Sequence, residues 1–199
     1  MSKDEIENNI DFTIDDKTIL VTYHPVTLGS RTAEQDINDF LGALDERPEL
    51  HIIFTMPNSD TGSQAIVAAI NDFIVRNPHR AVAFKSLGVL RYLSVMQQVA
   101  AVVGNSSSGL VEVPSFGIPT LNIGDRQKGR LSADSVLNCM TDKNSIVGGL
   151  DHVLSPEFRA FARKAKNPYD KEGTAQAIFD VISSYPLEKL SQKHFYDLQ

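Results

Sequence analysis

The sequence predicts an α/β protein built on a doubly wound parallel sheet. Short runs of β-branched and apolar residues, such as Ile19-Leu20-Val21-Thr22-Tyr23, alternate with longer segments whose apolar residues recur at helical spacing. Such a run, without polar alternation, is typical of a strand that is buried on both faces. Strands that alternate with helices form parallel sheets with right-handed crossovers, which is the Rossmann-like arrangement.

The first predicted strand, residues 19–23, ends at His24-Pro25, because proline offers no N–H to a ladder and favours an extended residue before it. Thr32 and Gln35 then have the spacing of a capping box, and the apolar stripe after them predicts a helix. Further strands are predicted at residues 50–55, 81–84, 100–103, 119–123 and 136–140, with helices at about 63–76 and 89–98 and one after residue 109.

The predicted organisation is a lead-in, one domain and a tail. Residues 1–17 have no clean period, so we expect a linker there with at most one short strand. The Rossmann-like domain is expected over residues 18–185, ending with a helix that begins after Gly173. The tail at 186–199 contains aromatic residues that need a surface to pack on; they could fold back or cross to a partner domain.

Composition excludes several classes of protein. The net charge of −6 and pI near 5.3 argue against a nucleic-acid binder, which needs a surplus of Lys and Arg. No apolar run approaches the roughly 20 residues of a membrane span, and the polar, acidic N-terminus does not resemble a signal peptide. We therefore expect a cytoplasmic protein. The single Cys139 excludes an internal disulfide and a cysteine-based zinc cluster.

The serine-rich segment Gly104-Asn105-Ser106-Ser107-Ser108-Gly109 follows a predicted strand and leads into a predicted helix. Ligands of parallel α/β sheets bind at the carboxyl ends of strands, and N–H groups, hydroxyls and a helix N-terminus there suit a phosphate. Glu112 projects one turn further on, about 6 Å along the axis, where a carboxylate suits a sugar diol. The segment therefore fits a nucleotide; a serine-rich N-cap followed by a glutamate is the alternative, and the motif alone leaves both open.

Other strand ends supply further candidates. His24 could donate to a phosphate or act as an acid/base near neutral pH, or it could simply bond a loop carbonyl. Asp60 could serve a turn into the next helix. No pair of histidines has metal-ligand spacing on a predicted element, so we expect no metal. Neither GxGxxG after the first strand nor a Walker-type loop occurs, which weighs against NAD and FAD, and no cofactor is expected.

Six motifs in order resemble the C-terminal half of the hydrolysing UDP-N-acetylglucosamine 2-epimerases, enzymes of sialic-acid precursor synthesis. Each motif is weak alone, but their order and spacing are specific, and they extend from about residue 19 to the end of the chain. They are the strand with His24-Pro25, the segment 57–63 (PNSDTGS), Lys85-Ser86-Leu87-Gly88, the segment 103–113 (VGNSSSGLVEV), Phe116-Gly117-Ile118-Pro119, and Asn122-Ile123-Gly124-Asp125-Arg126-Gln127, followed by Phe195-Tyr196-Asp197 near the end.

This resemblance implies one half of a GT-B fold, in which two Rossmann-like domains hold a UDP-sugar between them. The parent enzyme would convert UDP-N-acetylglucosamine and water into N-acetylmannosamine and UDP, by elimination of UDP and hydration of the glycal. His24 would be the acid/base or stabilise the departing UDP. The implied substrate contacts are Asn58 and Asp60 near the nucleotide-sugar, Ser86 and Leu87 at the uracil, Ser106 and Ser107 at the diphosphate, Glu112 at the ribose, and Arg126.

The acidic catalytic groups of such enzymes belong to an N-terminal half, which this chain lacks. We therefore expect the chain alone to be inactive, the tail to be a natural C-terminus, and the parent to be a homo-oligomer. Two other enzyme classes share this kind of site: the non-hydrolysing epimerases, which more often carry His-Arg-Arg-Glu-Asn where this chain has His24-Pro25-Val26-Thr27, and the donor-binding half of a GT-B glycosyltransferase. A non-catalytic module that senses nucleotides is a further alternative.

Overall fold

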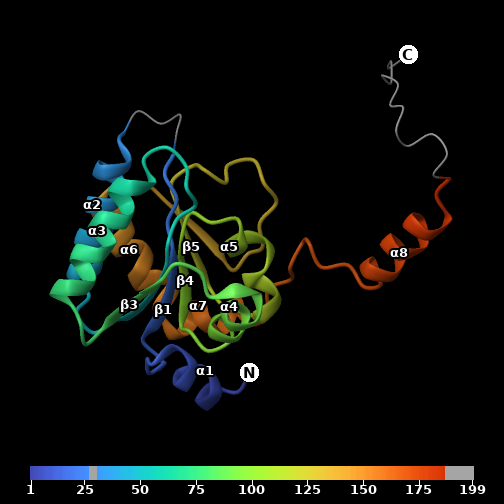
Figure 1. Cartoon of the computed structure of the whole chain (residues 1–199), viewed down its shortest axis with the longest axis horizontal. Helices are drawn as coiled ribbons and strands as arrows, with labels where there is room; N and C mark the ends of the chain where they lie inside the picture. The colour runs from blue at the N-terminus through green and yellow to red at the C-terminus, as the bar shows by residue number, and fades with distance from the viewer. Residues whose placement is uncertain (27–30, 187–199) are drawn as a thin grey trace. The chain divides into compact units, whose positions relative to one another are not determined.

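A six-stranded parallel sheet forms the centre of the computed structural model, which describes residues 1–26 and 31–186 (Figure 1). The strand order is β3-β2-β1-β4-β5-β6, so the direction of winding reverses between β1 and β4. This confirms the predicted Rossmann-like, doubly wound α/β class. The strands are β1 (Thr18–Thr22), β2 (His51–Thr55), β3 (Ala81–Phe84), β4 (Ala101–Gly104), β5 (Thr120–Ile123) and β6 (Val136–Cys139).

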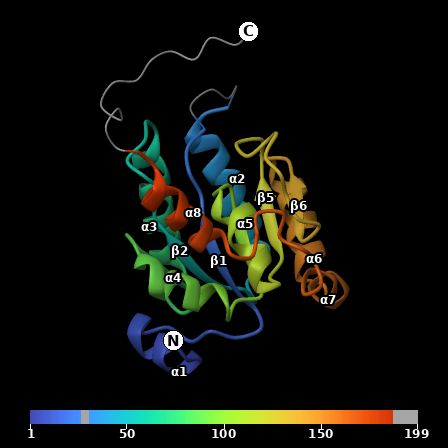
Figure 2. The ribbon, with the colours of Figure 1, turned by 90° about the vertical axis from the view of Figure 1, so that its right-hand side faces the viewer.

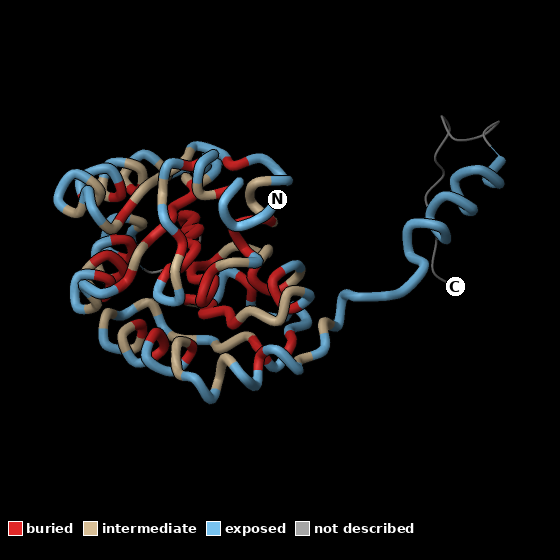
Figure 3. Tube along the Cα trace, turned by 90° about the horizontal axis from the view of Figure 1, so that it is seen from below, coloured by how far each residue is buried: buried red, intermediate tan, exposed pale blue. Residues whose placement is uncertain are grey.

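Helices cover both faces of the sheet, as the central strands require. Alternate residues of β1 point to opposite faces, so Ile19 and Val21 pack in one core cluster and Leu20 in the other. Figure 3 shows that the buried segments gather in the interior of the part of the chain that contains the sheet. The first cluster is covered by α2 (Ala33–Asp45), α3 (Ser63–Arg76) and α6 (Lys143–Leu154), and the second by α1 (Lys3–Ile10) and α4 (Gly88–Met96).

The first 17 residues differ from the linker with at most one strand that the sequence predicts. They contain helix α1, which Ser2 and Glu5 begin with a capping box. Ile6 and Ile10 are buried and pack in the same cluster as α4, which lies beside α1 in Figures 1 and 2. The sequence did not reveal this helix because Ile6 and Ile10 are its only apolar pair at i, i+4 spacing, and one such pair does not define a helical period. Ile14, after the helix, is buried as well.

The chain divides into two compact units, Met1–Tyr169 and Asp170–Gln199. The first also contains α5 (Ser108–Val111), a 3₁₀ turn (Val113–Phe116) and α7 (Pro156–Ala162). In the second, α8 (Thr174–Ser184) begins after Gly173 as predicted, and its apolar side chains are exposed. Residues 187–199 of the predicted tail lie outside the described residues. No helix among the described residues is both long and apolar enough to cross a membrane.

Candidate functional site

The side chain of Asn105 joins three loops at the carboxyl edge of the sheet. It follows β4 directly and is fully buried. Its Oδ1 accepts a hydrogen bond from the His24 N–H at 2.7 Å, and its Nδ2 donates to the His24 carbonyl at 2.8 Å. The Asn105 carbonyl in turn accepts from Arg126 Nη1 at 3.2 Å and from Gln127 Nε2 at 2.8 Å. Because β1 and β4 are neighbours, the loops after β1, β4 and β5 are held together at one point.

His24 lies in this cluster as a buried, neutral imidazole. Its side chain is 7% exposed, and its Nδ1 accepts a long hydrogen bond, 3.4 Å, from the Asn58 N–H. Burial lowers the pKa of His24, the charge of Arg126 lowers it further, and Asp60 opposes both. A neutral ring whose Nδ1 accepts carries its proton on Nε2. The histidine is therefore a hydrogen-bond donor through Nε2 near neutral pH.

The serine segment begins at a glycine that no other residue could replace without strain. Gly104 has φ +136°, and a Cβ there would lie 2.0 Å from the carbonyl oxygen of Thr22 on β1. Ser106 and Ser107 follow in half-buried positions, and Ser106 Oγ accepts from the Ser108 N–H at 3.4 Å. The close approach of β1 and β4 thus brings the serines next to the loop of His24.

The helix after the serines, which the sequence predicts without a length, is short. Helix α5 has four residues, Ser108–Val111, and a 3₁₀ turn continues from Val113. The prediction of a helix-dipole site was wrong in this respect, because so short a helix has little dipole to add. N–H groups and hydroxyls remain as the groups of the segment that could donate to an anion.

Glu112 lies on the same face as Ser108, as the i, i+4 spacing predicts. Ser108 Oγ donates to Glu112 Oε2 at 2.5 Å, and Tyr92 Oη donates to Ser108 Oγ at 3.0 Å. This chain of hydroxyls orients the carboxylate and leaves its other oxygen without a hydrogen bond among the described residues. Tyr92 comes from α4, so the chain also ties α4 to the serine segment.

Ser86 and Leu87 lie at the start of α4, one on the surface and one in the core. Ser86 is exposed, and its Oγ accepts from the Gly88 N–H at 3.1 Å. The Leu87 side chain is 3% exposed and packs in the core cluster of α1 and α4, while its carbonyl accepts from Arg91 Nε at 2.8 Å. Of these two residues, Ser86 is therefore the one whose side chain a ligand could contact. Tyr92, on α4, connects this helix to Ser108.

The structure therefore brings most of the predicted residues to one edge of the sheet. Around the imidazole of His24 lie Asn58, Asp60 and Arg126, and Asn105 connects them to the serine segment. The described residues contain no group of three or more His, Cys, Asp or Glu side chains that could hold a metal ion.

A cavity of about 580 Å³ lies at the ends of β5 and β6, and none of the predicted site residues lines it. Asn122 and Gln127 do, and each is almost completely buried. Sequence reasoning missed these two residues, Tyr92 and the role of Asn105. The only signal was position: Asn105 lies within the serine motif, and Asn122 and Gln127 flank Arg126 in the segment after β5.

Comparison with known proteins matches residues 1–183 to the family model described as UDP-N-acetylglucosamine 2-epimerase. The GDP/UDP-N,N'-diacetylbacillosamine 2-epimerase (hydrolyzing) of Campylobacter jejuni is 35% identical over 159 residues, 80% of this chain and 41% of that protein. The polysialic acid biosynthesis protein P7 of Escherichia coli is 34% identical over 181 residues, 90% of this chain and 46% of that protein.

Among solved structures, the Neisseria meningitidis UDP-GlcNAc 2-epimerase bound to UDP-GlcNAc superposes with a TM-score of 0.64 at 14% identity, covering 92% of this chain and 48% of that one. This likeness shows the shared fold, one half of a GT-B arrangement. The chain spans about half the length of the relatives it matches.

Proposed function

Because this chain belongs to the UDP-N-acetylglucosamine 2-epimerase family, we propose that it is the nucleotide-binding half of a hydrolysing 2-epimerase. The parent enzyme would convert UDP-N-acetylglucosamine and water into N-acetylmannosamine and UDP. The observation that carries the proposal is the Asn105 junction, which places a neutral histidine, an arginine and a serine segment at one edge of the sheet. A further half of the same polypeptide would complete the cleft.

The residues of this half suit the binding and departure of UDP. The hydroxyls and N–H groups of Ser106 and Ser107 would hold the diphosphate, and the carboxylate of Glu112 would accept from the ribose hydroxyls. The Nε2–H of His24 and the charge of Arg126 would stabilise the negative charge that develops on the leaving UDP. The N–H groups around Ser86 would meet the uracil.

In the proposed reaction a base removes the proton at C2 while the bond from C1 to the UDP oxygen breaks, which gives a glycal and UDP. Water then adds across the double bond: hydroxide forms a bond to C1 and a proton returns to C2 on the opposite face. The carboxylates for these proton transfers would come from the other half, since the acidic residues near the junction, Asp60 and Glu112, serve the histidine and the ribose in this proposal.

The proposed binding of UDP is tested by calorimetric titration of this chain with UDP. We expect weak binding, and at least a tenfold loss in Ser106→Ala and Glu112→Ala, on the order of one to two charge-assisted hydrogen bonds. Glu157→Ala is the matched control, because Glu157 is an exposed carboxylate on α7. Equal binding by all variants would favour a non-catalytic module instead.

The proposed reaction is tested on the two-domain parent enzyme. Product analysis separates N-acetylmannosamine from UDP-N-acetylmannosamine, the product of a non-hydrolysing enzyme, and from transfer of the sugar to an acceptor. Steady release of UDP by this chain alone would contradict the proposal that both halves are needed. A second candidate substrate is a UDP-sugar with two acetamido groups, because the Campylobacter jejuni relative is a GDP/UDP-N,N'-diacetylbacillosamine 2-epimerase.

A further inference from the structure

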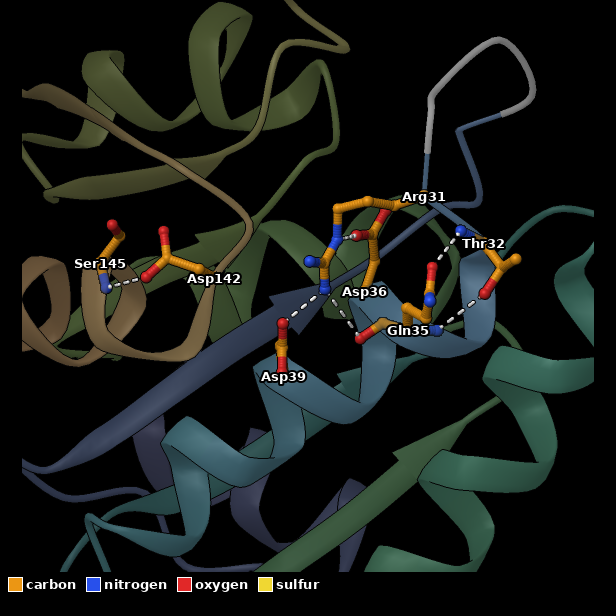
Figure 4. Close-up of polar contacts among 7 residues, drawn as sticks. All are labelled: Arg31, Thr32, Gln35, Asp36, Asp39, Asp142 and Ser145. Carbon is orange, nitrogen blue, oxygen red and sulfur yellow. Dashed lines mark hydrogen bonds and ion pairs between the residues drawn. The ribbon is translucent and has the colours of Figure 1, made fainter.

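The carboxylate of Glu112 has neither of two structural roles that other acidic side chains of this chain have. Asp36 accepts from Arg31 Nε at 2.6 Å, and Asp142 caps α6 by accepting from the Ser145 N–H at 3.0 Å (Figure 4). Glu112 forms no ion pair within the part of the chain that the structure describes. It also makes no capping bond to the 3₁₀ turn that follows it. Its negative charge is therefore available to a ligand.

A serine hydroxyl holds this carboxylate in place. Ser108 begins α5, and its Oγ donates to Glu112 Oε2 at 2.5 Å, one turn further along. The Glu112 N–H donates to the Ser108 carbonyl at 2.9 Å, so a backbone bond and a side-chain bond join the same two residues. A hydroxyl is neutral, so it orients the carboxylate without cancelling its charge, which an arginine partner would do.

The hydroxyl of Tyr92 fixes the direction of the bond from Ser108. Tyr92 Oη lies 3.0 Å from Ser108 Oγ. Each hydroxyl has one proton and a carboxylate can only accept, so the Ser108 proton goes to Glu112 and the Tyr92 proton goes to Ser108. Burial raises the pKa of Tyr92, so its hydroxyl keeps this proton throughout the neutral range. Each donor in such a chain polarises the next, which strengthens the bond to the carboxylate.

The ring of Tyr92 is held independently of its hydroxyl. It lies on α4 and packs against the buried cluster that α1 and α4 share. Ser108 and Glu112, in contrast, belong to the segment that follows β4. A change of Tyr92 to phenylalanine therefore keeps the packing of the ring and removes only the hydrogen bond to Ser108.

We propose that Tyr92 and Ser108 are positioning residues for Glu112 and thereby set the preference of the site for a sugar with two neighbouring hydroxyls. The proposal rests on the function proposed above, in which Glu112 accepts from the ribose. Ser108 occupies Oε2, and the other carboxylate oxygen has no hydrogen bond among the described residues. A carboxylate that is already oriented loses little conformational entropy when it accepts from both hydroxyls of a ribose. A freely rotating carboxylate gains less from the second hydroxyl.

Calorimetric titration of this chain with UDP and with 2'-deoxy-UDP tests the proposal. We expect UDP to bind about tenfold more tightly, the effect of one hydrogen bond to a carboxylate. In Tyr92→Phe and in Ser108→Ala this ratio should fall to about threefold or less, because Glu112 is no longer held in one orientation. Tyr169→Phe is the matched control: Tyr169 Oη donates to the Leu131 carbonyl at 3.1 Å, and its loss should leave the ratio unchanged.

Two further variants separate positioning from a merely structural role. In Glu112→Ala the two nucleotides should bind equally, and the addition of Tyr92→Phe should change nothing further, because Tyr92 acts through Glu112. Ser108→Thr keeps the hydroxyl and should keep the ratio of the wild type. A merely structural role of Tyr92 would weaken the binding of both nucleotides by the same factor and leave their ratio as it is.

The outcomes separate this inference from the proposed function. If UDP binds but Tyr92→Phe and Ser108→Ala keep the ratio of the wild type, the inference is overturned while the function stands. Equal binding of both nucleotides by the wild type overturns it as well, since Glu112 would then not distinguish one hydroxyl from two. If the chain does not bind UDP, the proposed function fails and this inference fails with it.

Discussion

Removal of the Asn105 amide should destabilise the fold and the candidate site together. In Asn105→Ala, the N–H and the carbonyl of His24 each lose a hydrogen bond, of 2.7 and 2.8 Å, in a buried position. A buried polar group without a partner costs about 1–3 kcal/mol, so two such groups cost about 2–6 kcal/mol. Some water can reach the end of the sheet, and we therefore expect about 3 kcal/mol.

For a domain of this size, about 3 kcal/mol lowers the thermal midpoint by about 6–12 °C. Thermal unfolding followed by circular dichroism measures the shift. Asn144→Ala is the matched control: Asn144 is exposed in the first turn of α6 and should change the stability by no more than about 0.5 kcal/mol. A midpoint for Asn105→Ala equal to that of the control would refute the role assigned to this amide.

Asn105→Asp separates the two bonds by their dependence on pH. One carboxylate oxygen can still accept from the His24 N–H, but the other faces the His24 carbonyl, so burial and this carbonyl raise the pKa of the introduced group. The folded state then binds the proton more tightly than the unfolded state, whose aspartate titrates near 3.9, about its ordinary value. Relative to the wild type, stability should rise as the pH falls from 7, whereas the deficit of Asn105→Ala should stay constant.

Three other outcomes concern acid, glycine and thiol chemistry. The pKa of His24 is lower in the folded protein than its ordinary value of about 6.5, so the free energy of unfolding should fall as the pH drops from that value through the folded pKa. Arg126→Ala removes a nearby positive charge and should raise the pKa of His24 in an NMR titration. A lower pKa of His24 in this variant would contradict the electrostatic role of Arg126. Gly104→Ala should lower the free energy of unfolding by at least about 3 kcal/mol or abolish folding, because the added Cβ would clash with β1. Gly148→Ala is the control: nothing lies near this position of α6, so the free energy of unfolding in urea should rise by about 0.5–1 kcal/mol. Burial raises the pKa of Cys139 to about 12, so Ellman's reagent at pH 8 should react with it in urea and only slowly in the native protein.

The strands were predictable because their residues carry local information. The run at 19–23 is β-branched and apolar, and both of its faces are buried in the sheet. Helix α6 was not predicted, because Gly148 and Gly149 interrupt its pattern. A Cβ at Gly149 would lie 2.6 Å from Leu121 Cδ1, so close packing of this helix on β5 requires the glycine. The sequence shows that the two glycines lower the helix propensity, but it does not show that α6 packs closely on β5 at Gly149.

In the candidate site, too, features that depend on local sequence were predictable, and features that depend on tertiary contacts were not. Residues at strand ends could be grouped because the carboxyl ends of parallel strands share one edge of the sheet. The bonds of Asn105 could not be predicted, since they depend on β1 and β4 being neighbours although 81 residues separate Asn105 from His24. The bond between Tyr92 and Ser108 likewise depends on where α4 lies relative to the serine segment in the folded chain.

The hydrogen bonds of the Asn105 junction are a physical reason to expect the binding of UDP by this chain alone that we propose above. The backbone of His24 and the side chains of Arg126 and Gln127 are fixed by Asn105 before any ligand arrives, so little further ordering is needed on this side of the cleft. In the proposed function, binding of the nucleotide would therefore depend on groups that Asn105 holds in place. Proton transfer at C2 requires a base on the open side, and for that step the second half of the cleft is indispensable in the proposed mechanism.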